Sequence, residues 1–490
     1  MSTPGKMEPE QLRTLGHRMV DWVVDYLERI ESLPVLSRAE PGDLLAALPK
    51  KPPQEGFDPG EWDQIFNDLD NLILPGITHW QSPSFFAYFS ANSSGPSILG
   101  ELLCAGLGTQ GMLWATSPAA TELEIRMLEW LGDMLELPPS LKGPQGGGCI
   151  QGTASESTLV AMIAARKRVL ESTGAAPDKL VAYASTQAHS SVVKAAMIAG
   201  LCHDASGGDA LHLVAVDRNL AMDPTALAQA MQADRVAGRI PFFACATVGT
   251  TSSGAVDPVR KIADVLTESH FVTDGGWLHI DAAYAGAGCI CPEHRHLLEG
   301  VEQADSICFN AHKWLLTNFD CSCFWTRDRT GLINALSVTP EYLRNHASDA
   351  GDVIDYRDWQ IPLGRRFRAL KLWLVIRHYG VEGLREHVRH HVRLAELFAE
   401  LVRADERFEI CAPPSLGLVC FRLPGEDADA KNRELLARLN ATGEAYISHT
   451  TLPLPAPDGS ESYVLRMAIG ATMTEERHVR AAWDLISRLA

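Results

Sequence analysis

Short apolar runs alternate with amphipathic stretches between about residue 95 and residue 380. Apolar runs bounded by turn residues predict strands, and apolar positions with a helical period predict helices. The expected strands are Leu180–Ala184, Leu211–Val216, Phe242–Thr247, Trp277–Ile280 and Ser306–Phe309, and the expected helices are Glu156–Leu170, Pro224–Asp234 and Pro258–Glu268. This alternation predicts an α/β fold with a mostly parallel sheet, in which ligands bind beyond the carboxyl ends of the strands.

The regions on either side of this central part have different patterns. Residues 1–94 contain an amphipathic helix signal over Leu12–Leu27 and a second one around Asp63–Leu74, with few strand signals. We expect this stretch to be a helical extension that packs on a partner subunit. Residues 381–490 run helix, strand, helix, strand, helix, which predicts a small α+β domain. The sequence therefore predicts three parts: 1–94, the large domain 95–380 and the small domain 381–490.

Composition narrows the class of protein. The chain is 46% hydrophobic and 21% charged, as expected of a globular protein with a sizeable core. Its formal net charge of -18 argues against nucleic-acid or anionic-membrane binding. No apolar run reaches the roughly 18–20 residues that span a bilayer, and the N-terminus lacks the pattern of a signal peptide. We expect a cytoplasmic protein.

Cysteine and histidine patterns give no indication of a metal site. The 11 cysteines are scattered and form no CxxC pair, so we expect reduced thiols and no zinc. The clusters His294–His296 and Arg389–Arg393 lie in charged, helix-like sequence, which favours a solvated helix face. The sequence therefore predicts no bound metal.

Two strand ends carry residues typical of cofactor chemistry. Lys313 follows the strand Ser306–Phe309, although a lone lysine at such a place is usually a surface charge. Asp281 ends the strand before it and is followed by small residues; a helix cap is the simple alternative. In an enzyme that uses pyridoxal 5′-phosphate (PLP), such an aspartate would keep the pyridine nitrogen protonated. Small residues beside it would leave room for the flat ring.

Two further segments could complete such a site. In Gly146–Glu156, glycines lead into Thr153, and Glu156 three residues later gives a capping-box signature. The first turn of the following helix could hold a phosphate, or the pattern could serve capping alone. His189, after the strand Leu180–Ala184, could stack on a cofactor ring or could be a loop histidine without a role.

The run Phe309–Trp314 resembles the lysine motif of the group II PLP-dependent decarboxylases, most closely the aromatic-L-amino-acid decarboxylases. The resemblance covers nearly the whole chain and includes Thr78–Phe89, Ser117–Glu124, Thr247–Thr251 and Trp359–Phe367. It implies the aspartate-aminotransferase-like fold (fold type I), PLP as cofactor, and a homodimer with active sites at the subunit interface.

The resemblance also implies roles for individual residues. Lys313 would hold PLP as a Schiff base, Asp281 would pair with the pyridine nitrogen, and His189 would stack on the ring and handle protons. Tyr342, in a mobile loop over about 336–355, would protonate Cα. The phosphate would be held by Ala154, Ser155, Asn310 and His312, with Thr251 and Ala283 near the ring. The substrate pocket would comprise Trp80, Tyr88, Phe89, Ala91 and Gly364, with Gln110 and Met112 from the neighbouring subunit.

The implied reaction converts an aromatic L-amino acid into its arylalkylamine and CO2. Gly364 favours a large ring such as that of tryptophan, because histidine and plant tyrosine decarboxylases tend to carry serine there. Ala91 cannot bond a ring hydroxyl as the threonine of catechol-preferring relatives can, whereas Gln110 could serve either ring. DOPA, 5-hydroxytryptophan, tyrosine and phenylalanine remain possible substrates, and histidine is disfavoured.

Two alternatives stay open. An aromatic aldehyde synthase would decarboxylate and then oxidatively deaminate; such relatives typically replace the loop tyrosine or the stacking histidine, whereas this chain keeps Tyr342 and His189. A non-catalytic binding protein with the same fold would be expected to lose Lys313 or Asp281, and both are present.

Overall fold

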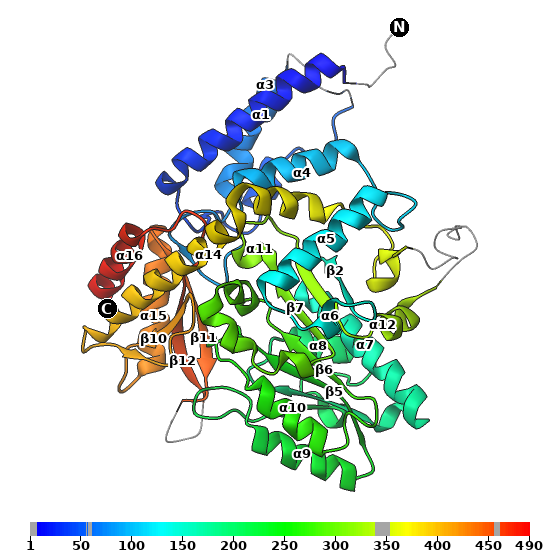
Figure 1. Ribbon diagram of the computed structural model, residues 1–490. Helices are drawn as coiled ribbons and strands as arrows, with labels where there is room; N and C mark the ends of the chain where they lie inside the picture. Colours follow the sequence, from blue (N-terminus) through cyan, green and yellow to red (C-terminus); the bar gives the residue numbers. More distant parts are fainter. Residues whose placement is uncertain (1–6, 55, 57–60, 339–352, 455–460) are drawn as a thin grey trace.

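A seven-stranded sheet forms the centre of the computed structural model, which describes residues 7–54, 56, 61–338, 353–454 and 461–490 (Figure 1). The strand order is β2-β8-β7-β6-β5-β3-β4, with β4, β3, β5, β6 and β7 parallel and β8 antiparallel to both of its neighbours. The strands are β2 Gly147–Gln151, β3 Leu180–Ser185, β4 Leu211–Val214, β5 Ile240–Thr247, β6 Trp277–Asp281, β7 Ser306–Asn310 and β8 Ser322–Thr326. All five expected strands are present, and β2 and β8 were not anticipated.

Helices cover both faces of this sheet, as the alternating pattern predicts. Alternate strand residues face opposite layers, so that Val181 packs with one helix set and Ala182 with the other. One layer contains α5 Pro118–Met134, α9 Pro224–Val236 and α10 Val259–Glu268. The other contains α7 Ala154–Thr173, α8 Ser191–Ile198 and α12 Arg329–Leu336. The remaining short helices of this part are α6 Pro139–Lys142 and α11 Ala311–Trp314.

A second, five-stranded sheet has the order β1-β11-β12-β10-β9. Its strands are β1 Phe85–Phe86, β9 Glu409–Ile410, β10 Leu418–Arg422, β11 Tyr446–Leu452 and β12 Ser462–Ala468. The helices α15 Ala428–Thr442, α16 Glu476–Leu489 and the second half of α14 Arg368–Arg403 pack against it. Because β1 pairs with β11, the segment before residue 94 joins the C-terminal sheet.

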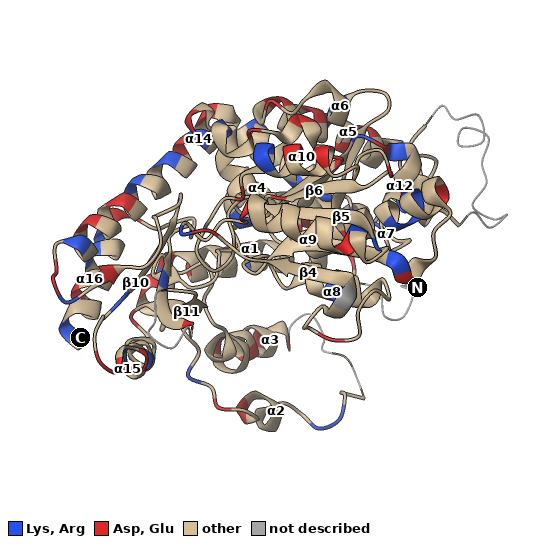
Figure 2. Ribbon diagram, turned by 90° about the horizontal axis from the view of Figure 1, so that it is seen from below, with Lys and Arg blue, Asp and Glu red and all other residues tan. Residues whose placement is uncertain are grey.

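α14 links the two sheets and bends at Gly380, whose φ of 66° is left-handed (Figure 1). Acidic and basic residues alternate along α14 (Figure 2), and Arg389 forms an ion pair with Glu382. The solvated-face interpretation of the histidines on this helix is wrong for His391, which is buried and accepts a hydrogen bond from Trp314 at 2.9 Å. The helical period turns His391 inward while Arg389 points outward. Within the described residues, no cluster of three potential ligands could hold a metal.

The N-terminal helices are α1 Pro9–Arg29, α2 Asp43–Ala47 and α3 Trp62–Asp68, followed by α4 Gly95–Leu107. α1 and α3 lie side by side, joined by the Arg18–Asp63 ion pair, and project from the body of the molecule (Figure 1). The surfaces of α1 and α4 expose large apolar side chains, among them Leu12, Val20, Val24, Leu99, Leu102, Leu103 and Leu107. Within the described ranges, no helix is both long and apolar enough to cross a membrane. The proposed boundaries at 94 and 380 stay predictions.

Candidate active site

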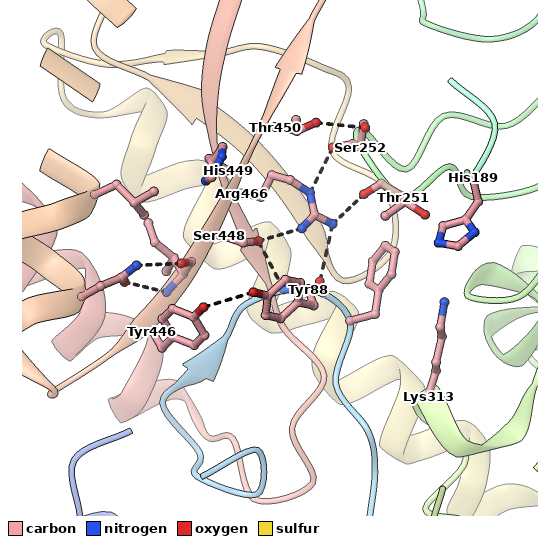
Figure 3. Close-up of a pocket in the computed structure, with 14 residues that line it drawn as sticks. Tyr88, His189, Thr251, Ser252, Lys313, Tyr446, Ser448, His449, Thr450 and Arg466 are labelled. Atoms are coloured by element: carbon pink, nitrogen blue, oxygen red, sulfur yellow. Dashed lines mark hydrogen bonds between the residues drawn. The ribbon is translucent and has the colours of Figure 1, made fainter. Parts of the chain in front are cut away.

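Several of the predicted site residues lie at the carboxyl ends of the parallel strands, along one edge of the central sheet. Asp281 is the last residue of β6, and Asn310 the last of β7, with Lys313 in the short α11 that follows. His189 lies between β3 and α8. The His189 imidazole and the Lys313 amine point toward one another across a pocket, with Thr251 beside them (Figure 3). Neighbouring parallel strands end at the same edge, which explains how residues far apart in the sequence meet here.

The pocket is a cavity of about 490 Å³ between this edge and the small C-terminal sheet. Of the predicted site residues, Tyr88, Phe89, His189, Thr251 and Lys313 line it. The opposite wall comes from α15, β11 and β12 and includes Tyr446, Ser448, His449 and Arg466 (Figure 3). The cavity is therefore built by three separate parts of the chain.

Lys313 has an environment that favours its neutral amine. Burial lowers the pKa of Lys313, the Asp281 carboxylate opposes this shift, and the positive charge of Arg466 adds to it. The Lys313 Nζ lies 5.2 Å from the centre of the Phe89 ring. A neutral amine is the form that can attack a carbonyl group, so the site suits a lysine that bonds covalently to an aldehyde.

His189 is held in one tautomer. Its Nδ1 accepts a hydrogen bond from the Ser191 backbone N–H at 3.1 Å and lies 2.9 Å from the Ser191 Oγ. Burial lowers the pKa of His189, which favours the neutral ring. Because Nδ1 is an acceptor, the proton of the neutral imidazole is on Nε2. His189 can therefore offer one N–H donor from a flat, uncharged ring.

Asp281 is almost fully buried, with 3% of its surface exposed. Its Oδ1 accepts a hydrogen bond from the Ala283 backbone N–H at 3.0 Å. The Ala283 carbonyl in turn accepts from the Asn310 N–H at 3.0 Å, which joins the ends of β6 and β7. The carboxylate is thus fixed at the floor of the site.

The N-terminus of α7 differs from the predicted capping box. Thr153 is the N-cap residue as expected, but its side chain makes no capping hydrogen bond. The Glu156 carboxylate instead accepts from the Gly152 N–H at 3.2 Å and from the Ile361 N–H at 3.1 Å. Glu156 therefore links the loops that contain Gly152 and Ile361. The Thr153 hydroxyl makes no capping hydrogen bond to α7. Ala154 is buried and Ser155 is exposed at this helix end.

Several buried polar atoms at the same sheet edge make no hydrogen bond within the described structure. They are Ser185 Oγ at the end of β3, Gln187 Oε1 just after it, Thr247 Oγ1 at the end of β5 and Asn310 Oδ1 at the end of β7. Buried polar groups in folded proteins nearly always have partners, so this set indicates a polar ligand at the edge. A group such as PLP, with a phosphate, a ring hydroxyl and a protonated ring nitrogen, fits these residues together with Asp281 and Lys313.

Ser185, Gln187 and Thr247 were missed by the sequence analysis. A polar residue at the end of an otherwise apolar strand is the signal that could have identified them. His312 was expected, and it is buried with Nδ1 accepting from the Cys321 N–H at 2.9 Å. Burial lowers the pKa of His312 to about 3, so its ring is neutral and its Nε2 carries the proton.

An aromatic cluster forms the wall beside the lysine. The Phe89 ring stacks on Tyr284 with a centroid distance of 3.7 Å. Tyr88 has a positive φ of 53°, and its hydroxyl lies 3.2 Å from that of Tyr446. Trp80 stacks on Tyr88 at 5.6 Å but does not line the cavity itself. Ala91, also outside the lining, accepts a hydrogen bond from Gln81 through its carbonyl.

Gln110, Met112 and Gly364 lie outside the Lys313 cavity of their own chain. The Gln110 Oε1 accepts from the Arg365 N–H at 3.3 Å, and a Cβ added at Gly364 would stand 3.5 Å from the same oxygen. Gln110 and Gly364 therefore form one surface. It is supported by the buried ion pair between Arg365 and Glu124 at 2.7 Å.

Arg466 is a further residue that the sequence analysis missed. Its exposed fraction is 3%, and it donates hydrogen bonds to the carbonyls of Thr251 at 2.6 Å and Ser252 at 3.1 Å (Figure 3). Further bonds reach the Ser448 Oγ at 2.8 Å and the Tyr88 carbonyl at 3.5 Å. A charged residue inside the apolar strand Tyr463–Ala468 was the available signal. Arg466 joins all three parts of the chain that build the cavity.

The predicted proton donor Tyr342 lies outside the described residues, as does most of the expected loop over 336–355. Its role stays a prediction.

Comparison with known proteins identifies the protein family. Residues 41–424 match the family model described as the pyridoxal-dependent decarboxylase conserved domain, and the chain belongs to this family. It is similar to tryptophan decarboxylase 2 of Oryza sativa subsp. japonica, with 50% identity over 98% of this chain and 94% of the relative. It is also similar to phenylacetaldehyde synthase of Arabidopsis thaliana, with 51% identity over 99% of this chain and 96% of the relative.

Among solved structures, the crystal structure of the Oryza sativa enzyme TDC with PLP and tryptamine has a TM-score of 0.93 and 44% identity, over 99% of both chains. The predicted family and fold type I are confirmed. The protein is a PLP-dependent carboxy-lyase, which also confirms the predicted cofactor.

Proposed function

We propose that this protein decarboxylates an aromatic L-amino acid, tryptophan above the others, to the arylalkylamine and CO2. The observation that carries the proposal is the Lys313 amine, which faces His189 in a cavity that is walled by Phe89 and Tyr88. The similarity to a tryptophan decarboxylase over nearly the full chain supports an aromatic substrate.

The site contains residues suited to bind each functional group of PLP. Lys313 would hold PLP covalently through its amine, and the buried Asp281 carboxylate would accept the proton of the ring nitrogen. The first turn of α7 with Ala154 and Ser155, together with Asn310 and His312, would bind the phosphate. Thr251 and Ala283 would lie beside the ring. Bound PLP supplies an electron sink for the pair released when the Cα–carboxylate bond breaks.

The remaining residues orient the substrate and handle protons. His189 would stack on the ring and offer its Nε2–H, while the Phe89 and Tyr88 rings would hold the substrate side chain and exclude water. Tyr342 would return a proton to Cα after CO2 has left. Arg466 has four hydrogen bonds to neutral oxygens, so it is suited to hold the cavity walls in place.

We further propose a cytoplasmic homodimer with active sites at the subunit interface. Gln110, Met112 and Gly364 lie outside the cavity of their own chain, so a second copy would bring them to a site. The exposed apolar residues of α1 and α4 would be covered by that copy. All 11 cysteines are free thiols, which is typical of a reducing compartment.

The direct test is an amine-release assay with tryptophan, DOPA, 5-hydroxytryptophan, tyrosine, phenylalanine and histidine. We expect tryptamine formation with equimolar CO2, weaker turnover of the hydroxylated rings, and least turnover of histidine. A preference for histidine would contradict the aromatic-pocket assignment, and no amine from any of the six would contradict the proposed function.

A second candidate is an aromatic aldehyde synthase, which the similarity to phenylacetaldehyde synthase favours. Retention of both Tyr342 and His189 supports the decarboxylase instead. We expect Tyr342→Phe to shift products from amine toward aldehyde, ammonia and hydrogen peroxide, because oxygen can react once the Cα proton donor is lost. Product analysis by mass spectrometry with a peroxide assay would show this. A wild-type enzyme that already releases aldehyde and peroxide would favour the synthase.

A further inference from the structure

His279 is a fully buried histidine that lies one layer beneath the proposed cofactor site. It occupies β6 two residues before Asp281, and its neighbour across the sheet on β7 is Ser306. Burial lowers the pKa of His279 to about 4, so the ring is neutral. None of the roles assigned above uses this residue.

The hydrogen bonds around His279 select one tautomer. The Ser306 Oγ accepts from the Trp277 indole N–H at 2.7 Å and lies 2.8 Å from the His279 Nδ1. If Ser306 donates its hydrogen to the His279 Nδ1, both the Trp277 indole N–H and the Ser306 hydroxyl have an acceptor. The opposite tautomer would leave the Ser306 hydroxyl hydrogen without one, which is unfavourable in the interior. The proton of His279 is therefore on Nε2.

The Nε2–H faces two groups that lead to opposite ends of the site. One is Thr158 Oγ1 on α7, at 3.5 Å. Thr158 donates its own hydrogen to the Ala154 carbonyl at 3.1 Å, so its oxygen can only accept from His279. Ala154 belongs to the helix turn that is proposed to hold the phosphate.

The other group is the Cys308 Sγ, at 3.8 Å from the His279 Nε2. The Cys308 thiol lies 4.0 Å from the Asp281 Oδ1 and can donate to it. Burial raises the pKa of this thiol, so it keeps its hydrogen. A single direction of donation thus runs from Trp277 through Ser306, His279 and Cys308 to the Asp281 carboxylate.

We propose that His279 is a positioning residue that fixes both ends of the cofactor site, Asp281 through Cys308 and the first turn of α7 through Thr158. The donors directed at Asp281, the Cys308 thiol and the Ala283 N–H, hold its carboxylate in the place where it would pair with the ring nitrogen. The inference rests on the proposed assignment of Asp281 to that nitrogen. The other titratable groups that face Asp281 in the described structure are Lys313, His189 and the thiol of Cys245 on β5, which burial keeps protonated.

The test compares His279→Phe, which removes both donor and acceptor, with His279→Gln, whose amide can replace each. The readouts are the PLP dissociation constant of the apoenzyme and the pH titration of the cofactor absorbance in the visible. For His279→Phe we expect PLP binding to weaken by about tenfold, the size of one or two lost hydrogen bonds. We expect the midpoint of the absorbance titration to move upward by about half a pH unit or more, because a less well positioned Asp281 carboxylate would stabilise less positive charge on the cofactor ring. His279→Gln should recover most of both effects.

Tyr183→Phe is the matched control, because Tyr183 is buried in the same sheet and donates to Asp234 at 2.7 Å, away from the site. It should lower the thermal midpoint without moving the absorbance titration. A folded His279→Phe enzyme with wild-type PLP affinity and titration would overturn the role of His279. If that variant does not fold, Ser306→Ala decides, because it removes the hydroxyl that donates to the His279 Nδ1: a PLP affinity and an absorbance titration unchanged from wild type would overturn the role of His279. A wild-type protein that takes up no PLP would overturn the proposed function instead.

Discussion

The two halves of the site are built in different ways. The proposed cofactor half lies at the carboxyl edge of the parallel strands β6 and β7, at whose ends Asp281, Asn310 and Lys313 stand. The substrate half combines the Tyr88–Phe89 segment with strands of the small sheet, and Gln110 lies on a separate surface of the chain.

Because of this difference, the residues proposed for the chemical step are separate from those proposed to select the substrate. Strand ends in a packed sheet hold their side chains to a fixed geometry, which a covalently bound cofactor requires. The substrate wall depends on contacts between parts of the chain, such as those of Arg466, and can vary without disturbing the cofactor residues. Changes in the cofactor half should therefore reduce the rate for every substrate, whereas changes in the substrate half should alter the ranking of substrates.

The largest expected effect is that of Asp281→Asn. Asparagine can still accept from the Ala283 N–H, but it lacks the negative charge that is proposed to pair with the ring nitrogen. We expect kcat/KM to fall on the order of 10²–10³-fold for all aromatic substrates alike. Asp264→Asn, on the exposed face of α10, is the matched control and should leave the rate unchanged. A rate close to wild type in Asp281→Asn would remove Asp281 from the site.

Arg466→Met tests the link between the halves. The variant loses hydrogen bonds to Thr251, Ser252, Ser448 and Tyr88, and we expect about 2–4 kcal/mol less free energy of unfolding. The loss of kcat/KM should be roughly tenfold or more and unequal between tryptophan and DOPA, because the substrate wall loses its anchor. Denaturant unfolding and steady-state kinetics measure both. Equal losses for the two substrates would show that Arg466 serves the cofactor half alone.

The pattern of the sequence predicts the cofactor half better than the substrate half. The apolar runs predict β3 to β7 and place Asp281 and Lys313 at strand ends, while the roles of these two residues come from the family resemblance and stay predictions. The antiparallel β2 was not anticipated because its run begins with two glycines, which are depleted in strands, whereas β8 was missed although Phe324, Trp325 and Thr326 favour a strand. β1 depends on its pairing with the distant β11, which no local pattern encodes, whereas Arg466 had a local signal, its charge inside an apolar strand, that does not show which segments it contacts.

Asp257, which lies beside the proposed cofactor half, should make the free energy of unfolding depend on pH. It accepts hydrogen bonds from the Thr247 and Met222 N–H groups at the end of β5, and burial raises its pKa from 3.8 to about 6. A carboxyl group with a raised pKa stabilises the fold below its unfolded value and loses that contribution as the pH rises through about 6. Relative to Asp257→Asn, we expect wild type to lose about 2–3 kcal/mol of unfolding free energy between about pH 4 and about pH 7. A difference that is constant with pH would contradict this assignment.

The smallest effect is expected from Gly364→Ser in the substrate half. An added Cβ meets only the Gln110 Oε1 at 3.5 Å, so the fold should tolerate the change. We expect the ratio of kcat/KM for tryptophan over tyrosine to fall several-fold, about 0.5–1.5 kcal/mol, because the hydroxyl narrows the pocket and offers a hydrogen bond. An unchanged ratio would remove Gly364 from the specificity argument.

The central claim is that Lys313 holds the cofactor, and borohydride reduction of the purified holoenzyme tests it most directly. Reduction should fix PLP to the protein irreversibly, and peptide mapping by mass spectrometry should find the pyridoxyl group on Lys313. Label on another lysine, such as the buried Lys371, or no label on a protein that has bound PLP, would contradict the account.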